Sequence, residues 1–449
     1  MENERTDVRR AWLALAALSL GFFMSLLDQA TVAVALPQIA ADWGIDYAQA
    51  AWVSSAYLLA VVVPLPVTGR MGDTFGHRRM FLAGVALFTA AATSAALMPT
   101  YPLLVVARLA QGLGAAMLMP QAMAVINQIF PRERRGAAFG VWGVVGAAAG
   151  FAGPVLAGLI VSSVGWRGIF LLHLPVGIVA LILASRWVPT LPQSPARLDL
   201  VSVALSFLGI GAIVFSVQEG LNTLGLRVLA AVGVAFFVAF LLRQRREDAL
   251  VPLRLFRSRN FVIGTATIVV MGVVVSAQLI PIMAWLQDTR GLSPEQSGLV
   301  ATPMAVVGFV LGPVCGFLSD RVHPRVMHVT GFAIIAASQL AMYLAMRQDY
   351  AIVVVLAAVA GLGVGQSFIW AANAAAVLGE LQPTDMGAAS GVYNTSRQLG
   401  GVLGVAAVGL LLGSAGPAPA MLLLAGVVTV GLVVAAGFTT GRGSEQALS

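Results

Sequence analysis

The chain has 449 residues, of which 59% are hydrophobic and 10% charged, and its formal net charge is +7. Soluble globular proteins hold about 25% charged residues, whereas uncharged apolar runs of roughly 17 to 25 residues recur here, long enough to cross ~30 Å of hydrocarbon. The composition therefore excludes a soluble globular protein and predicts an all-α polytopic membrane protein.

Fourteen membrane-spanning helices are predicted from the apolar runs between polar breaks. In chain order they cover residues 11–36, 48–71, 79–98, 102–124, 136–160, 167–187, 200–218, 226–243, 261–286, 296–319, 325–346, 351–378, 387–412 and 419–439. An even number of spans places both termini on the same side of the membrane.

Arginine predicts which side that is, because basic residues concentrate in cytoplasmic loops. Twenty arginines fall in the termini and in the loops on their side, and two, Arg108 and Arg397, fall inside spans. The opposite side carries four, which are Arg167, Arg227, Arg290 and Arg347. We therefore predict cytoplasmic termini, and we attribute the positive charge to topology and membrane lipids, with no nucleic-acid partner.

The basic residues also exclude several kinds of chemistry. All 26 of them are arginines, so the chain has no lysine for a phosphate-binding Gly-x-x-x-x-Gly-Lys loop or for a Schiff base. The four histidines form no His-Glu-x-x-His zinc motif. We expect no enzyme activity, no cofactor and no metal, so that any work would draw on an ion gradient or on a partner.

A single carboxylate lies inside the first span. Asp28 stands in FMSLLDQATVAVALP, and residues 11–27 and 29–41 carry no charge. Acids inside membranes are costly and mark ion or substrate pathways, and burial favours the neutral form of a carboxylic acid. We predict that Asp28 takes up and releases a proton. The alternative is a structural acid that is capped by hydrogen bonds or paired with Arg108.

The fourth span carries Arg108, with Gln111 one turn later on the same face. An arginine close to Asp28 would favour its charged form and so oppose the effect of burial. The alternative role for Arg108 is to brace the helices by binding backbone carbonyls. Arg397, in the thirteenth span, is expected to be structural.

Two loops on the arginine-rich side repeat each other. GRMGDTFGHRRM (69–80) follows the second span, and GFLSDRVHPRVM (316–327) follows the tenth, 247 residues later. The repeat predicts two pseudo-symmetric six-helix bundles, in residues 1–190 and 251–449, with an inserted two-helix hairpin and its linkers in residues 191–250. Secondary transporters are commonly built from such repeats, with the substrate site between the halves near the midplane.

These motifs resemble those of the major facilitator superfamily, and within it the fourteen-helix drug:proton antiporter branch. The resemblance covers nearly the whole chain. It rests on GRMGDTFGHRR, on ARLAQGLGAAML (107–118), on GVVGAAAGFAGPVLAG (143–158), on LDQATVAVALP (27–37) and on YNTSRQLGGVLGVA (393–406). It implies a proton-coupled exporter of the bacterial cytoplasmic (inner) membrane that works by alternating access, with Arg108 involved in proton coupling.

The remaining site predictions fall into three groups. The loop residues are expected to close a cytoplasmic gate through ion pairs, or else to serve only as topological signals; they are Gly69, Asp73, Gly76, Arg78, Arg79, Asp320, Arg321 and Arg325. Small residues in the fifth span should let it pack closely and bend; they are Gly146, Gly150 and Gly153, with Pro154. Polar and aromatic side chains are candidates for a substrate pocket or for packing; they are Trp52, Tyr57, Gln111, Gln278, Trp285, Trp370, Asn373, Tyr393 and Asn394.

Aromatic faces suit lipophilic cations, so the function predicted from sequence is export of hydrophobic compounds, cationic ones among them, by a monomer that exchanges them for protons. The alternatives are a dedicated exporter of one metabolite, self-made antibiotic or lipid, and a membrane sensor or scaffold that transports nothing.

Overall fold

A computed structural model describes residues 2–192, 199–244, 253–319, 321–348, 350–378 and 386–439. Within these ranges every regular element is helical, and thirteen helices are long and apolar enough to cross a membrane. A bent helix pair, Tyr47–Val62 with Val67–Phe75, makes a fourteenth span when it is counted as one. The predicted all-α fold with fourteen spans is confirmed.

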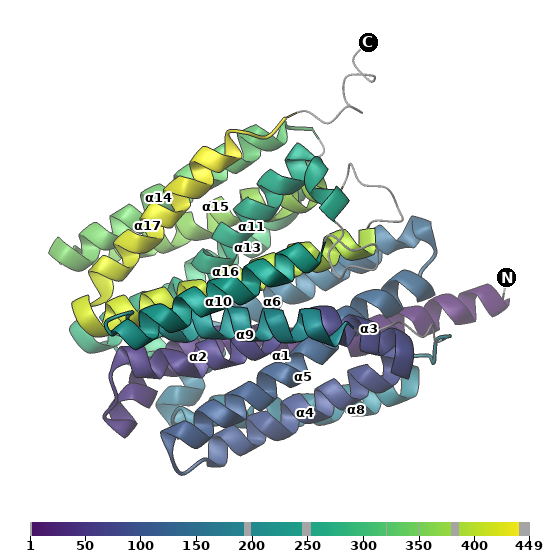
Figure 1. Cartoon of the computed structure of the whole chain (residues 1–449), viewed down its shortest axis with the longest axis horizontal. Coiled ribbons are helices and arrows are strands. Elements are labelled where there is room, and N and C mark those ends of the chain that lie inside the picture. Colours follow the sequence, from purple (N-terminus) through teal and green to yellow (C-terminus); the bar gives the residue numbers. More distant parts are fainter. Residues whose placement is uncertain are drawn as a thin grey trace.

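The helices follow one another along the chain as two bundles with a hairpin between them (Figure 1). The N-terminal bundle contains α1 (Glu2–Trp43), α2 (Tyr47–Val62), α3 (Leu65–Phe75), α4 (His77–Leu97), α5 (Tyr101–Ile129), α6 (Arg132–Val164), α7 (Arg167–Leu171) and α8 (His173–Trp187). The hairpin contains α9 (Leu200–Gln218) and α10 (Leu224–Arg243). The C-terminal bundle contains α11 (Arg259–Ala277), α12 (Leu279–Ala284), a π-helical turn (Trp285–Thr289), α13 (Pro294–Ser319), α14 (Pro324–Gln348), α15 (Ile352–Leu378), α16 (Met386–Ala415) and α17 (Pro417–Ala435).

The second predicted span is interrupted. It was expected as one helix over 48–71, but α2 ends at Val62 and α3 begins at Leu65, with a bend of 52°. Pro64 lies at the break, where its missing N–H and its ring prevent the regular helical hydrogen bond. The bend redirects α3, which itself carries residues 69–75 of the repeated motif.

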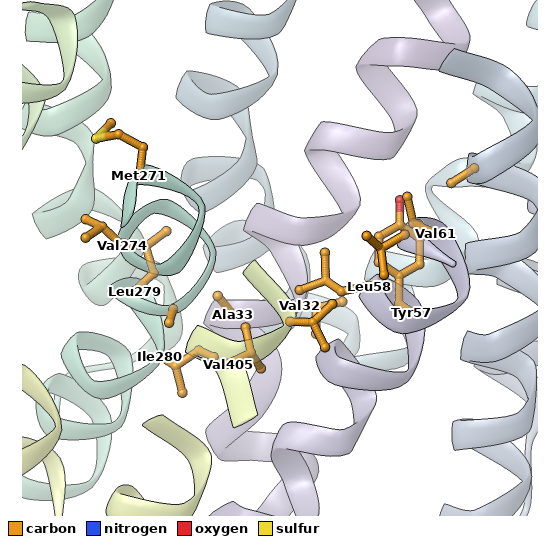
Figure 2. Packing of buried hydrophobic residues seen from close by; sticks show 14 of the residues in the cluster. Val32, Ala33, Tyr57, Leu58, Val61, Met271, Val274, Leu279, Ile280 and Val405 are labelled. Carbon is orange, nitrogen blue, oxygen red and sulfur yellow. The ribbon is translucent and has the colours of Figure 1, made fainter. Parts of the chain in front are cut away.

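The two bundles meet through symmetry-related helices. In the N-terminal bundle α2 packs against α16 of the other bundle, and α6 packs against α13. The repeat makes α2 equivalent to α13 and α6 equivalent to α16, so the two contacts are related by a pseudo-two-fold axis. Near this axis, Val32 of α1 lies between Leu58 of α2 and the side chains of Ile280 and Val405 from the other bundle (Figure 2).

One end of the molecule is closed. We call the two ends arginine-rich (Arg10, Arg78, Arg186, Arg243 and Arg259) and arginine-poor (Arg167, Arg227, Arg290 and Arg347). At the arginine-poor end a Cβ added to Gly298 of α13 would lie 2.3 Å from the carbonyl oxygen of Pro154, and one added to Gly409 of α16 would lie 2.3 Å from Cβ of Ala51. Toward the arginine-rich end, a Cβ on Gly150, Gly308, Gly312 or Gly391 would meet nothing within 4 Å.

Hydrogen bonds between the bundles reinforce this closure. The Gln287 side-chain amide donates to the Val34 carbonyl at 3.0 Å, and the Glu295 backbone N–H donates to Ser162 Oγ at 3.2 Å. The Tyr47 hydroxyl donates to Asp288. The two bundles are therefore held together at the arginine-poor end.

The hairpin lies across one of the two seams between the bundles. Helix α9 packs against both α2 and α16 (Figure 1). Near the arginine-poor end, Gln218 donates to the Ala48 carbonyl at 3.2 Å, and Trp52 Nε1 donates to Glu219 at 3.1 Å. The hairpin thus covers the α2–α16 seam and leaves the α6–α13 seam uncovered by α9 and α10.

At its other end the hairpin is joined by an ion pair. Arg243 in the last turn of α10 donates to both carboxylate oxygens of Asp199, with Nε 2.9 Å from Oδ2 and Nη2 2.9 Å from Oδ1. These bonds from Arg243 hold the pKa of the Asp199 carboxyl well below its usual range. Asp199 also caps α9 by accepting from the Ser202 N–H.

We predict that Gly298→Ala loosens the arginine-poor end. The added methyl overlaps the Pro154 carbonyl and should disfavour the closed conformer by about 1–3 kcal/mol, or roughly 5- to 150-fold in the conformational equilibrium. Double electron–electron resonance between spin labels at Leu97 and Val353, with Cys315 replaced, should show a population with longer distances between the labels. Gly308→Ala is the matched control, and equal distance distributions for the two variants would contradict the prediction.

We predict that Asp199→Asn weakens the hairpin without removing its cap, since asparagine also caps helices. The loss should be at most about 1 kcal/mol because the pair is partly exposed. The carboxyl pKa is lowered on folding, so the ion pair contributes fully above the ordinary value of ~3.9 and is lost as the pH falls below it. Unfolding is measured in mixed micelles. The difference in the free energy of unfolding between the variant and wild type should be constant between pH 5 and 8 and should shrink below about pH 4.

Candidate functional site

Asp28 and Arg108 form a fully buried ion pair. Asp28 projects from α1 and Arg108 from α5, and both have 0% exposed surface. Arg108 Nη1 lies 2.9 Å from Oδ1 of Asp28 and 2.7 Å from Oδ2. Gln111, one turn after Arg108, donates its amide to the same Oδ1 at 2.9 Å. The structure therefore brings together the three buried polar residues that the sequence placed in the first and fourth spans.

The rest of the guanidinium is satisfied by neighbouring helices. Arg108 Nε donates to the Val53 carbonyl of α2 at 2.7 Å, and Nη1 donates to Gln111 Oε1 at 2.6 Å. The guanidinium carbon lies 4.4 Å from the Tyr57 ring centroid and 5.6 Å from that of Phe170. Arg108 thus also binds a backbone carbonyl, which was the alternative expectation, while it neutralises Asp28.

The two oxygens of Asp28 are not equivalent. Oδ1 accepts from both Arg108 and Gln111, whereas Oδ2 accepts no hydrogen bond from a described residue, although it lies close to the arginine. Oδ2 nevertheless lies 2.7 Å from Arg108 Nη1, so the guanidinium charge faces both oxygens of the carboxylate. Protonation there would leave Arg108 as an unneutralised charge, so a proton on Asp28 and the closed ion pair oppose each other.

A small cavity of about 10 Å³ adjoins the pair. It is lined by Gln29, Ser54, Tyr57, Leu58, Arg108 and Ser276. A space of this size is close to the minimum that holds one water molecule. Because Ser276 belongs to α11 of the other bundle, Arg108 faces the boundary between the two halves.

Several contributors to this cluster carried no sequence signal that singled them out. The backbone carbonyl of Val53 could not be predicted as a partner of Arg108, because a pattern of residue types carries no information on backbone acceptors. Ser25, one turn before Asp28, lies with its hydroxyl 2.8 Å from that of Tyr57 and so fixes the ring that covers Arg108. Its spacing of three residues from Asp28 was the only available hint.

The other pocket candidates are dispersed. Trp52 binds the hairpin residue Glu219 at the arginine-poor end. Trp285 is buried beneath Arg290, whose guanidinium carbon lies 4.8 Å from the ring centroid. Neither tryptophan is brought to the Asp28 cluster, and their place in a substrate pocket stays a prediction.

The candidates of the C-terminal bundle lie on three helices. Gln278 is buried, and its amide faces Met304 Sδ at 3.4 Å. Asn373 is buried and donates to Thr267 at 2.8 Å. Tyr393 is buried, while Trp370 and Asn394 are half-buried. A role in binding substrate is likewise a prediction for all five.

The gate loop differs from the ion pairs expected for it. Asp73 lies 3.4 Å from His77 Nε2, whereas the Arg78 guanidinium donates to the Ser185 carbonyl of α8. Gly76, whose φ of 95° is in the left-handed region, separates α3 from α4. Asp73 at the end of α3 thus faces His77 at the start of α4, and Arg78 points toward α8. A Cβ added to Gly69 would lie 3.6 Å from Cβ of Pro120 in α5.

The remaining gate residues are only partly described. Arg79 is exposed, and Asp320 lies outside the described residues. The Arg321 guanidinium lies over the Phe317 ring at 4.0 Å, and Arg325 is exposed. Gate closure by Asp–Arg pairs is therefore not what the described residues form in this conformer, and a gating role stays a prediction.

The small residues of the fifth span pack against two helices. A Cβ on Gly146 would lie 3.2 Å from the Phe22 ring of α1, and one on Gly153 would lie 2.4 Å from Cβ of Ala30. The Pro154 carbonyl faces α13. Of the predicted set, only Gly150 has no such contact. Helix α6 thus joins α1 within its own bundle and α13 across the seam.

Two pseudo-symmetric helical bundles with a charged pair buried at their boundary define a membrane transport protein. The chain belongs to the Major Facilitator Superfamily, which it matches over residues 18–405 and again over 261–447. Among the described residues no three His, Cys, Asp or Glu side chains lie together in a way that could hold a metal ion.

Three relatives are similar along most of their length. An uncharacterised MFS-type transporter of Mycobacterium tuberculosis is 38% identical, over 89% of this chain and 70% of the relative. The tetracenomycin C resistance and export protein of Streptomyces glaucescens is 33% identical, over 90% and 76%. The multidrug resistance protein Stp of Mycobacterium tuberculosis is 31% identical, over 90% and 76%.

Two solved structures share the fold. A D-xylose-proton symporter superposes with a TM-score of 0.71 at 14% identity, over 96% of this chain and 99% of the other. A peptide transporter superposes with a TM-score of 0.72 at 14% identity, over 94% and 93%. At this identity the likeness concerns the arrangement of the helices alone.

We predict that Arg108→Leu strongly destabilises the protein, by about 3–5 kcal/mol, because it leaves a buried carboxylate without its partner. Adding Asp28→Asn should recover most of the loss, since it removes the charge that needs neutralising. Unfolding of the two single variants and the double variant in mixed micelles forms a double-mutant cycle. Additive effects would show that the two residues are not energetically coupled.

Proposed function

We propose that the protein is a proton-coupled exporter of hydrophobic compounds that works by alternating access. The observation that carries the proposal is the buried Asp28–Arg108 pair, with Arg108 facing the boundary between the bundles. A membrane protein without a nucleotide-binding loop needs an ion gradient to drive uphill transport, and a buried acid at this boundary is the group able to sense one.

Proton binding and the conformation would be linked through the ion pair. When a proton neutralises Asp28, Arg108 loses its counter-charge and the packing of α1, α2 and α5 around it changes. When Asp28 releases the proton, the pair re-forms. The bundles of residues 1–190 and 251–449 would then rock about the central helices, while the hairpin region 191–250 stays on its seam.

We propose that the arginine-rich end faces the cytoplasm of a bacterium, in the inner membrane, because basic loops are retained on that side. The conformer described above would then be closed toward the outside. A proton entering from outside needs the opposite conformer to reach Asp28, so each cycle would carry one proton inward as the compound leaves.

Export of foreign or self-made compounds is supported by the relatives. One of them is named for tetracenomycin C resistance and export, and another for multidrug resistance. The relative that is named for tetracenomycin C favours a second candidate function, the dedicated export of one compound. Accumulation assays with a broad panel of hydrophobic antibiotics and dyes separate the two, since a dedicated exporter would lower the accumulation of one chemical class only.

The charge of the substrate is a separate question. Cationic compounds were expected because aromatic faces attract cations. Here the Tyr57 face is occupied by Arg108 at 4.4 Å, and the Trp370 ring has Arg397 at 5.9 Å. Guanidinium groups already use these faces, so the arrangement gives no support to a cationic preference.

We predict that Asp28→Asn abolishes uphill export, with at least a hundredfold loss of proton-driven accumulation in proteoliposomes, because the side chain can no longer exchange a proton. Downhill exchange of the same compound should survive, since it needs the bundles to rock but no proton. The compound used is one that the wild-type protein is first shown to move.

Asp42→Asn is the matched control for this experiment. Asp42 lies at the arginine-poor end of the same helix and accepts a hydrogen bond from Trp166 at 2.7 Å. The Asp42→Asn variant should keep proton-driven accumulation within about twofold of wild type. If Asp28→Asn still accumulates the compound against its gradient at the wild-type rate, proton coupling through Asp28 is refuted.

A further inference from the structure

Arg397 is a second arginine inside the membrane-spanning region, and no described residue supplies it with a counter-ion. It is the only charged residue between 387 and 415 of α16. None of the ion pairs formed by the described residues includes it, and its guanidinium donates no hydrogen bond to any of them. Its described contact is with the Trp370 ring, whose centroid lies 5.9 Å from Cζ.

The position of Arg397 is fixed by close helix packing. A Cβ added to Gly272 of α11 would lie 2.0 Å from the Arg397 carbonyl oxygen, and one added to Gly400 would lie 2.1 Å from that of Val269. Helices α11 and α16 therefore touch backbone to backbone at Arg397 and one turn after it. The arginine cannot swing to a distant partner by a shift of its helix against α11.

Its side chain lies on the face of α16 that adjoins the boundary between the bundles. One turn after Arg397, a Cβ on Gly401 would lie 2.6 Å from Ser276 Oγ, and Ser276 lines the cavity next to Arg108. Arg397 is half-buried, so part of its surface stays accessible.

The two bundles therefore differ in their charge. In the N-terminal bundle Asp28 neutralises Arg108 at 2.7 Å. In the C-terminal bundle no described acid pairs with Arg397, so its positive charge is not neutralised by any described residue. Charged groups within membranes pair with an opposite charge or face a route for a charged ligand, and leaving a buried arginine unpaired is strongly unfavourable.

We propose that Arg397 binds the anionic group of the exported compound, and that the substrates are hydrophobic acids such as aromatic carboxylates or phenolates. The ring of Trp370 lies beside the guanidinium, and Tyr393 lies one turn before it on the same helix face, so an aromatic body can pack where its anion is held. This inference rests on the proposed export function and specifies its substrate class.

Export of an anion also agrees with the energetics. Moving one negative charge outward is favoured by an inside-negative membrane potential. An inward proton adds a second charge movement in the same favourable direction. A substrate of this class can therefore be driven by the membrane potential as well as by the pH gradient.

The test compares a matched acid and alcohol, 1-pyrenebutyrate and 1-pyrenebutanol, which share one hydrophobic body. Their binding to the full-length protein in nanodiscs of zwitterionic lipid is measured by quenching of tryptophan emission, with empty nanodiscs subtracted. The variants are Arg397→Gln, which removes the charge, and Arg397→Lys, which keeps it. Arg347→Gln, an exposed arginine of α14, is the matched control.

We expect wild type to bind the acid at least roughly tenfold more tightly than the alcohol, the range of a charge-assisted contact. Arg397→Gln should abolish this preference while it leaves alcohol binding unchanged, which also shows that the variant is folded. Arg397→Lys should keep most of the preference, and Arg347→Gln should keep all of it. Equal binding of the two probes by wild type, or an undiminished preference in Arg397→Gln, overturns the inference.

The outcome is independent of proton coupling, because binding is measured without any gradient. If Arg397 confers the preference for the acid but Asp28→Asn still accumulates compounds at the wild-type rate, the coupling mechanism fails and the anion site stands. If Asp28→Asn is inactive but the acid is not preferred, the coupling stands and the anion site fails.

Discussion

The arrangement of the N-terminal bundle depends on the neutralisation of a charge that cannot reach water. Asp28 and Arg108 are both fully buried, and each would be strongly unfavourable alone. Gln111, the Val53 carbonyl and the Tyr57 ring supply the remaining contacts, so three helices are positioned around one guanidinium. Apolar residues of similar size would commonly give equal or greater stability at such a site. The pair is therefore a candidate functional element, as proposed above, and neighbouring helices satisfy both of its charges in this conformer.

The backbone of the fold has pseudo-two-fold symmetry, whereas its buried polar residues do not. Helices α2 and α13 occupy equivalent places, as do α6 and α16, and both seams are closed at the arginine-poor end by glycines that allow backbones to touch. The polar residues do not obey the symmetry, because the acid–arginine pair belongs to one bundle and Arg397, with which no described acid pairs, belongs to the other. Equivalent backbones thus carry different charged groups.

Much of this could be predicted from the sequence. The span count followed from the length of apolar runs, and the shared face of Arg108 and Gln111 followed from helical spacing. The contact of Asp28 with Arg108 could only be offered as an alternative, because spacing along two separate helices says nothing about their distance. Asp73 was expected beside arginine, yet the turn at Gly76 gives it His77. Arg397 was expected to be structural, because a missing partner becomes visible only when every neighbour is known.

The hairpin has a consequence for how lipid-soluble molecules reach the interior. Helices α9 and α10 cover the α2–α16 seam, so a compound dissolved among the acyl chains contacts the hairpin there and not the seam. The junction of α6 with α13 has no such screen, and the side chains of Val310 and Phe317 on α13 are exposed. The inserted helices thus cover one of the two seams between the bundles and leave the other facing the lipid.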